Sequence, residues 1–288
     1  MPLIERILFP VDFSHSCTAM AAYVKRAAAI FNAQVTLLNV AEFNLYTGME
    51  LGLRTFDDVA KDQFDAARLR LNAYLTADFP LATTTRVVRL GDPATQIAQA
   101  AHEIGAGLII MPTHAGIFRS TLLGSTTAKV LNDADCPVLT SRHAETIAPR
   151  PIEHREWLCA LGLTHNSERV LRFAAQVSAQ AGGHISIIHA VQANERDLPT
   201  GLDIRDTFES IARNRATREL EELKQKVGLE ADIRIALGNV KHALLEAANH
   251  YDADVLMIGR SSHSGPVGRL RDLTYAVVRD SPFPVLSI

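Results

Sequence analysis

The segment from residue 111 to residue 126 has the residue types that a phosphate-binding loop needs. Glycine lets backbone N–H groups turn toward a ligand, and a helix that begins just behind them presents further N–H groups. Gly116 and Gly124 supply the first property, and Gly124-Ser125-Thr126 opens an expected helix. No Walker lysine follows the glycine, so this is not a P-loop. The alternative is that Ser125 or Thr126 simply caps the helix.

A second segment, residues 258–274, has the same layout with different side chains. Arg271 and Asp272 stand where Gly124 and Ser125 stand in the first segment, and an aspartate there would repel phosphate. Arginines and serines of this segment offer anion binding through side chains, with a solvated polar loop as the alternative. They are Arg260, Arg269, Arg271, Ser261, Ser262 and Ser264.

Signs of catalysis or metal binding are weak. His114 lies in the first loop, where a histidine could act as a base, but no nucleophile–base–orienter set is readable. The three cysteines form no metal-binding cluster, and such a sparse, odd count fits reduced thiols that pack in a core. We therefore expect no catalytic residues, no metal site and, at most, a slow ATPase.

Length and composition set the broad class. The chain has 288 residues, of which 47% are hydrophobic and 21% charged, and its net charge is −3. This profile is typical of two globular domains and gives no general attraction to nucleic acid or to an anionic membrane. No apolar run reaches the roughly 18 residues of a membrane span, and the charged N-terminal segment is not a signal peptide. We expect a cytoplasmic protein without nucleic-acid or membrane partners.

An internal repeat organises the chain. Gly91, Pro112 and Pro137 match Gly238, Gly259 and Pro284 at a constant offset of 147 residues. "RILFPVDFSHSC" (6–17) resembles "EWLCALGLTHNS" (156–167), and "NAQVTLLNVAE" (32–42) resembles "GGHISIIHAVQ" (182–192). The repeat predicts domains over residues 1–145 and 156–288, joined by a polar linker over residues 146–155 with no periodicity.

Each half reads as alternating strands and helices. In the first half, strands are expected at 7–11, 35–40, 85–89, 108–111 and 137–141, and the unbroken apolar run at 7–11 predicts a strand buried on both faces. Helices between such strands imply right-handed crossovers and a parallel sheet of α/β type. Asp92 and Pro93 suit the start of one of these helices. Ligands of such sheets bind at the carboxyl ends of the strands. Asp12, Val40 and the 111–126 loop are therefore candidates for ligand contacts.

Both halves resemble the universal stress protein family, and the resemblance covers almost the whole chain. The segments that carry it are "ILFPVDFS", "LLNVAE", "GDPATQI", "LIIMPTHAG", "LLGSTTAKVL" and "DCPVLT". The resemblance implies two tandem doubly wound domains, each with a five-stranded parallel sheet flanked by helices. Such a fold is Rossmann-like, of the adenine nucleotide alpha hydrolase-like type.

One branch of the family binds ATP with a loop of the form G-x2-G-x9-G-[ST], and another branch does not. Carried over to this sequence, the resemblance implies ATP, with Mg²⁺, in the first half. The nucleoside would contact Pro10, Val11, Asp12 and Val40. Gly124, Ser125 and Thr126 would contact the phosphates. The nucleotide site would also include Met111, His114, Ala115 and Gly116.

The sequence departs from that loop in three ways. Pro112 and Ala115 stand at the first two glycines, and proline offers no N–H. Eight residues, 116–123, separate Ala115 from Gly124, one fewer than in the family pattern. In the second half, Gly162 replaces the aspartate and Ser262 the second glycine. We therefore expect any ATP in the first half and a degenerate second domain.

The sequence thus predicts a stress-response or regulatory protein, with a nucleotide-free scaffold or partner-binding stress protein as the alternative. The last apolar strand of each half, "CPVLTS" and "FPVLSI", would leave an unpaired edge, which proteins tend to cover. In the family the equivalent strands pair between domains. We expect the two halves to pair as a pseudo-dimer within the chain, with a homo-oligomer and protein partners of unknown identity beyond it.

Overall fold

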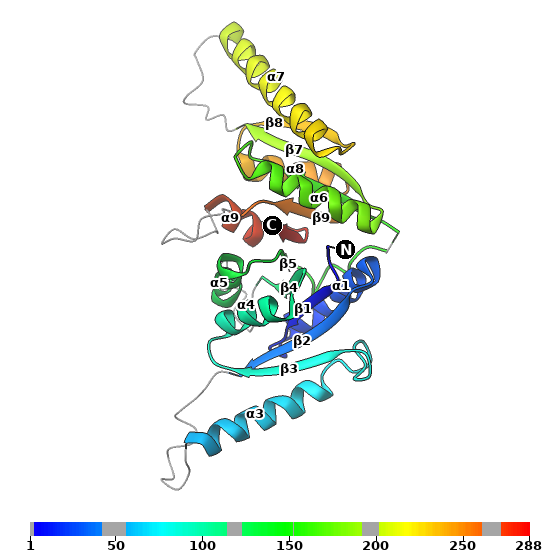
Figure 1. The fold of residues 1–288 in the computed structure, drawn as a ribbon. Helices are drawn as coiled ribbons and strands as arrows, with labels where there is room; N and C mark the ends of the chain where they lie inside the picture. The colour runs from blue at the N-terminus through cyan, green and yellow to red at the C-terminus, as the bar shows by residue number, and fades with distance from the viewer. Residues whose placement is uncertain (1–2, 42–55, 114–122, 152, 192–201, 261–271) are drawn as a thin grey trace. The chain divides into compact units, whose positions relative to one another are not determined.

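The structure is a computed structural model that describes residues 3–41, 56–113, 123–151, 153–191, 202–260 and 272–288. Its chain divides into two compact units, residues 2–149 and 150–288. Each unit alternates strands with helices, as Figure 1 shows by element label.

The first unit contains five described strands and four described helices. The strands are β1 (Arg6–Pro10), β2 (Gln34–Ala41), β3 (Thr85–Leu90), β4 (Leu108–Pro112) and β5 (Val138–Ser141). The helices are α1 (His15–Phe31), α3 (Phe56–Ala73), α4 (Pro93–Ile104) and α5 (Ser125–Asp133). The predicted strands are all present, with ends that shift by one residue.

These strands follow the order β3-β2-β1-β4-β5, and the pairings within the unit are parallel. Strand β1 lies in the middle, with Ile7 opposite Val35 of β2 and opposite Leu108 of β4. Ile7, Leu8 and Phe9 are fully buried, as the apolar run of this strand predicts.

Helix α4 begins where local sequence signals place it. Asp92 caps α4 by accepting a hydrogen bond from Thr95 N, and Pro93 occupies the first turn. This is the helix start that the sequence predicts. Right-handed crossovers from β1 to β2 and β3 put α1 and α3 on one face of the sheet, and the return to β4 and β5 puts α4 and α5 on the other. The chain therefore switches direction between β1 and β4.

The second unit repeats this design. Its strands are β6 (Glu156–Ala160), β7 (His184–Val191), β8 (Asp232–Leu237), β9 (Val255–Ile258) and β10 (Val285–Ser287). Its helices are α6 (Ser167–Ala181), α7 (Leu202–Val227), α8 (Val240–His250) and α9 (Asp272–Asp280). The order is β10-β9-β6-β7-β8, again parallel. The predicted fold class, a doubly wound parallel α/β sheet in each half, is confirmed.

Candidate functional site

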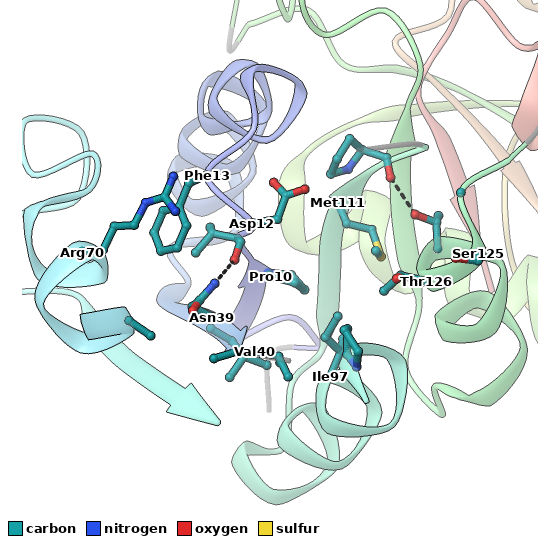
Figure 2. Close-up of a pocket in the computed structure, with 18 of the residues that line it drawn as sticks. Pro10, Asp12, Phe13, Asn39, Val40, Arg70, Ile97, Met111, Ser125 and Thr126 are labelled. Atoms are coloured by element: carbon teal, nitrogen blue, oxygen red, sulfur yellow. Dashed lines mark hydrogen bonds between the residues drawn. The ribbon is translucent and has the colours of Figure 1, made fainter. Parts of the chain in front are cut away.

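A cavity of about 700 Å³ opens at the carboxyl ends of β1, β2 and β4 in the first unit. Helices α3, α4 and α5 complete its walls, because residues of all three line it. This place is the switch point of the sheet, where doubly wound proteins bind ligands. Its volume lies within the range of about 300–1,000 Å³ that small-molecule sites occupy. Figure 2 shows the residues that surround it.

One part of the cavity is apolar. Pro10 and Met111 come from the ends of β1 and β4, Leu38 and Val40 from β2, and Ile97 from the first turns of α4. The strand order brings these three strand ends together, although the residues lie up to a hundred positions apart. Apolar walls of this kind suit a flat aromatic ring.

Asp12 follows this apolar part and is exposed. Its Oδ1 accepts a hydrogen bond from Ser14 N at 2.9 Å, which holds the carboxylate at the start of α1. Behind it, Asn39 is buried and donates from Nδ2 to Val11 O at 2.7 Å. Phe13 has a φ of 63°, so the backbone turns sharply after Asp12. The turn leaves a carboxylate that can accept hydrogen bonds from ligand hydroxyl groups.

An aromatic and cationic group borders Asp12 on one side. The Arg70 guanidinium of α3 lies 4.1 Å from the centre of the Phe13 ring, and Tyr74 meets the same ring edge-on at 5.1 Å. Figure 2 shows Asp12 between this group and the Ser125–Thr126 side of the cavity. The cavity wall therefore carries one carboxylate and one guanidinium near each other.

The opposite side of the cavity is the start of α5. Gly124 is the N-cap residue and has no side-chain capping hydrogen bond, and Ser125 is the first helical residue. The alternative that Ser125 or Thr126 caps the helix is therefore wrong. Thr127 donates from its hydroxyl to Pro112 O at 3.0 Å, which holds the helix start against the end of β4. The first-turn N–H groups of α5 and its dipole favour an anion here.

Pro112 has a structural role that the sequence did not indicate. It is the last residue of β4, paired with Ser141, and its carbonyl oxygen receives the Thr127 hydroxyl. Proline has no N–H to donate to the sheet at this end of the strand. The tie between β4 and α5 uses its carbonyl oxygen instead.

The cysteine nearest the site is chemically quiet. Cys17 is 1% exposed and donates weakly to Pro10 O at 3.5 Å. Burial, reinforced by the Asp12 carboxylate, raises the pKa of its thiol to about 12. A thiol with that pKa is protonated near neutral pH and is not a nucleophile. Within the described residues no group of three or more His, Cys, Asp or Glu side chains could hold a metal ion.

Eight of the eleven residues that the sequence predicts for the site line this one cavity: Pro10, Val11, Asp12, Val40, Met111, Gly124, Ser125 and Thr126. His114, Ala115 and Gly116 lie outside the described residues. Sequence reasoning missed Asn39, Phe13 and Arg70. Asn39 could have been found from the sequence, because it is a polar residue flanked by the apolar Leu38 and Val40. The position of Arg70 depends on how α3 packs.

The second unit has a cavity of about 370 Å³ at the equivalent place. His189 repeats the bond of Asn39, since its Nδ1 lies 2.8 Å from Leu161 O. Gly162 lines this cavity where Asp12 lines the first. Gly259 stands at the position of Pro112, and an added Cβ there would lie 2.9 Å from Val170 Cγ2. A side chain at Gly259 would therefore force the Val170 side chain of α6 to shift.

The fold and the cavities define a class: two consecutive doubly wound α/β units, each with a pocket at the carboxyl ends of its strands. The model of the universal stress protein family matches residues 4–142 and again residues 155–288. The chain belongs to this family and contains two of its domains in tandem.

Known relatives agree with this assignment. "Universal stress protein A homolog 1" of Coxiella burnetii is 25% identical over 144 residues, which cover 48% of this chain and 97% of the relative. "Universal stress protein A homolog 2" of the same organism is 29% identical over 142 residues, 47% of this chain and 94% of the relative. Each relative thus has the length of one half of this chain.

A solved structure matches both halves. The crystal structure of a universal stress protein from Archaeoglobus fulgidus has a TM-score of 0.67 and 22% identity, over 99% of this chain and 97% of that chain. This similarity supports the fold. Among the described helices, none is both long enough and apolar enough to cross a membrane.

Proposed function

We propose that the first unit binds an adenine nucleotide, with ATP and Mg²⁺ as the ligand, and that this binding serves a regulatory function in a stress response. The second unit is a degenerate partner that does not bind ATP. The observation that carries the proposal is the order of chemistry along the 700 Å³ cavity. An apolar slot, a carboxylate and a helix start follow one another, as base, ribose and phosphates do in a nucleotide.

Each part of the cavity suits one part of that ligand. The apolar slot of Pro10, Val40 and Met111 accommodates the adenine ring. Asp12 accepts hydrogen bonds from the ribose hydroxyl groups, as carboxylates do at other doubly wound nucleotide sites. The N–H groups of Ser125 and Thr126 face the phosphates at the start of α5.

Calorimetric titration of ATP with magnesium into nucleotide-free protein tests the proposal. Asp12→Asn keeps the shape but removes the charge, so it should weaken binding by roughly tenfold or more. Gly124→Arg puts a long side chain at the phosphate position and should abolish binding. Gly124→Ala is the matched control, because the φ of −58° and ψ of 140° at Gly124 are open to any residue.

Absence of ATP binding would support the alternative of a nucleotide-free scaffold or partner-binding stress protein. That alternative stands if the wild-type protein does not bind ATP at millimolar concentration. If all variants bind ATP equally, ATP binds elsewhere and the proposed site is wrong. Phosphate release with magnesium measures turnover in the same samples. Since the sequence shows no readable nucleophile–base–orienter set, we expect at most slow hydrolysis, lost together with binding in Asp12→Asn.

A further inference from the structure

We propose that the nucleotide site of the first unit also binds a phosphate group on the ribose, and that Arg70 of α3 is the residue that selects it. An adenine nucleotide with a phosphate ester on its 2′ or 3′ hydroxyl group then binds more tightly than one without it. This inference rests on the proposed function, because it assumes that the apolar slot receives adenine and that Asp12 receives the ribose.

The position of Arg70 in the cavity determines which part of a nucleotide it meets. Asp12 lies between Arg70 on one side and Ser125 and Thr126, at the start of α5, on the other (Figure 2). A ribose whose 5′ phosphates reach α5 directs its 2′ and 3′ hydroxyl groups toward Asp12 and away from α5. That is the side of the cavity that Arg70 lines.

The chemistry of Arg70 suits a phosphate group. A guanidinium stays charged at any physiological pH, and its planar set of N–H donors matches phosphate oxygens. At doubly wound dinucleotide sites, a carboxylate binds ribose hydroxyl groups, or a nearby arginine accommodates a ribose phosphate. The first cavity contains both kinds of side chain, Asp12 and Arg70. Asp12 therefore receives one hydroxyl group, while Arg70 receives the phosphate on the other and offsets the repulsion between that phosphate and Asp12.

An aromatic ring holds the guanidinium beside Asp12. Arg70 lies over the Phe13 ring, 4.1 Å from its centre, and such a cation–π contact leaves N–H donors for a ligand. Tyr74 meets the same ring edge-on at 5.1 Å, and the Tyr74 hydroxyl lies 2.8 Å from Thr18 Oγ1 of α1. The Phe13 ring is thereby fixed between α1 and the end of α3. Less conformational freedom is lost when a ligand binds to an arginine that is already held.

The second unit differs from the first at this place. Leu163 stands at the position of Phe13, with a positive φ of 50° in place of 63°. Helix α7 is the counterpart of α3, and none of its residues is among the described residues that line the second cavity. The repeated fold therefore does not require the contact between Phe13 and Arg70. The contact occurs in the same unit as Asp12, and this association favours a role in ligand binding.

Calorimetric titration of the full chain tests the inference by comparing AMP with adenosine 2′,5′-bisphosphate and adenosine 3′,5′-bisphosphate. All three probes have the same base and the same 5′ phosphate, so they differ at the ribose hydroxyl groups alone. We expect one of the bisphosphates to bind more tightly than AMP by roughly tenfold or more, because its second phosphate pairs with the Arg70 guanidinium. The bisphosphate that binds more tightly identifies the hydroxyl group that faces Arg70.

Two arginine variants of α3 assign the effect to one side chain. Arg70→Met removes the charge at an exposed position, so the variant should fold, and the preference for the bisphosphate should fall to about threefold or less. Arg68→Met is the matched control. Arg68 is 62% exposed, pairs with Asp65 at 3.1 Å and is not among the described residues that line the cavity. The control should keep the preference of the wild type, which would exclude a general effect of net charge.

Three results would overturn the inference: equal binding of AMP and both bisphosphates, an unchanged preference in Arg70→Met, or the same loss of preference in Arg70→Met and Arg68→Met. ATP titration of the wild-type protein separates this inference from the proposed function. If ATP binds but neither bisphosphate binds more tightly than AMP, the proposed function stands and the role of Arg70 is wrong. If ATP, AMP and both bisphosphates all fail to bind at millimolar concentration, the proposed function is wrong and this inference fails with it.

Discussion

Two hydrogen bonds at equivalent positions of the repeat, one buried and one partly buried, hold the turn after the first strand of each unit. Asn39 donates to Val11 O in the first unit, and His189 contacts Leu161 O in the second. The residues after the turn, Phe13 and Leu163, share a positive φ of 63° and 50°. Because the conformation occurs with and without an aspartate at the turn, it belongs to the fold. The part of the turn that we assign to the proposed ligand is therefore the Asp12 side chain.

This equivalence provides a matched pair of variants. Asn39→Leu removes the donor that holds Val11 O, so the Asp12 turn should loosen, and ATP should bind roughly tenfold more weakly. The free energy of unfolding should also fall by about 1–3 kcal/mol, because a buried carbonyl loses its partner. Calorimetry and urea unfolding measure the two effects.

His189→Leu is the control for that variant. It breaks the equivalent contact in the other unit. We expect a similar loss of stability without a change in ATP affinity. If both variants weaken ATP binding equally, general destabilisation is the cause, and Asn39 does not position the site.

Sequence and structure agree best at the scale of single elements. The inner strands such as β1 were predictable because both faces are buried, which leaves continuous apolar runs such as Ile7–Phe9. Helix α4 was predictable from Asp92 and Pro93.

The side walls of the site were harder to predict, for a physical reason. Strand ends in a parallel sheet meet at one edge, so Asp12 and Val40 follow from the strand pattern alone. The contact of Arg70 with Phe13 depends on the angle and depth at which α3 packs on the sheet. Interactions among residues far apart in the chain set that packing, and no local pattern encodes it. The same holds for the Thr127–Pro112 bond.

One arginine secures the end of α3. Arg86 of β3 donates to Leu71 O at 2.6 Å, to Tyr74 O at 2.9 Å and to Phe79 O at 2.7 Å. These carbonyl groups end the helix and the turn that follows it, where few N–H partners remain. Arg86→Met should lower the free energy of unfolding by about 2–4 kcal/mol, because several carbonyl groups lose a charged donor.

The matched control is a cation that makes a single exposed ion pair in the same unit. Lys25 pairs with Asp78 at 2.7 Å, and its side chain is 53% exposed. Lys25→Met should change the free energy of unfolding by no more than about 1 kcal/mol. Urea unfolding of both variants measures the difference. Equal effects would mean that Arg86 is not the anchor of this segment.

At the scale of the molecule, paired carboxylates make stability depend on pH. Hydrogen bonds from Arg279 and Lys241 hold the pKa of Asp280 well below its usual value. Paired arginine also lowers the pKa of Glu103 and of Asp252. A lowered pKa means that the unfolded chain binds more protons, so the stabilisation is present above the usual carboxylate pKa and is lost as pH falls.

The free energy of unfolding should therefore decline from about pH 5 to about pH 3. Asp280→Asn should be less stable than the wild type at pH 7 and should show a shallower decline, because the variant has one fewer paired carboxylate. Urea unfolding at several pH values tests this. Parallel curves for the two proteins would exclude Asp280 as a contributor.

The pairing of the two halves into a pseudo-dimer stays a prediction from their apolar last strands. A protease site inserted between Ala148 and Pro149, where Ala148 is exposed, would test it. After cleavage, the two halves should co-elute in size-exclusion chromatography. If their last strands pair, this pairing holds the halves together without a covalent link. Separate elution of two folded halves would contradict the prediction.

The central claim is that ATP binds in the first unit, between the ends of β1, β2 and β4 and the start of α5. Photolabelling with an azido-adenine analogue of ATP, followed by mass spectrometry of the peptides, tests it most directly. We predict labels on peptides that contain the adenine slot, around Val40, Ile97 or Met111, and loss of those labels when excess ATP is added. Labels confined to residues 150–288, or labels that excess ATP does not remove, would contradict the claim.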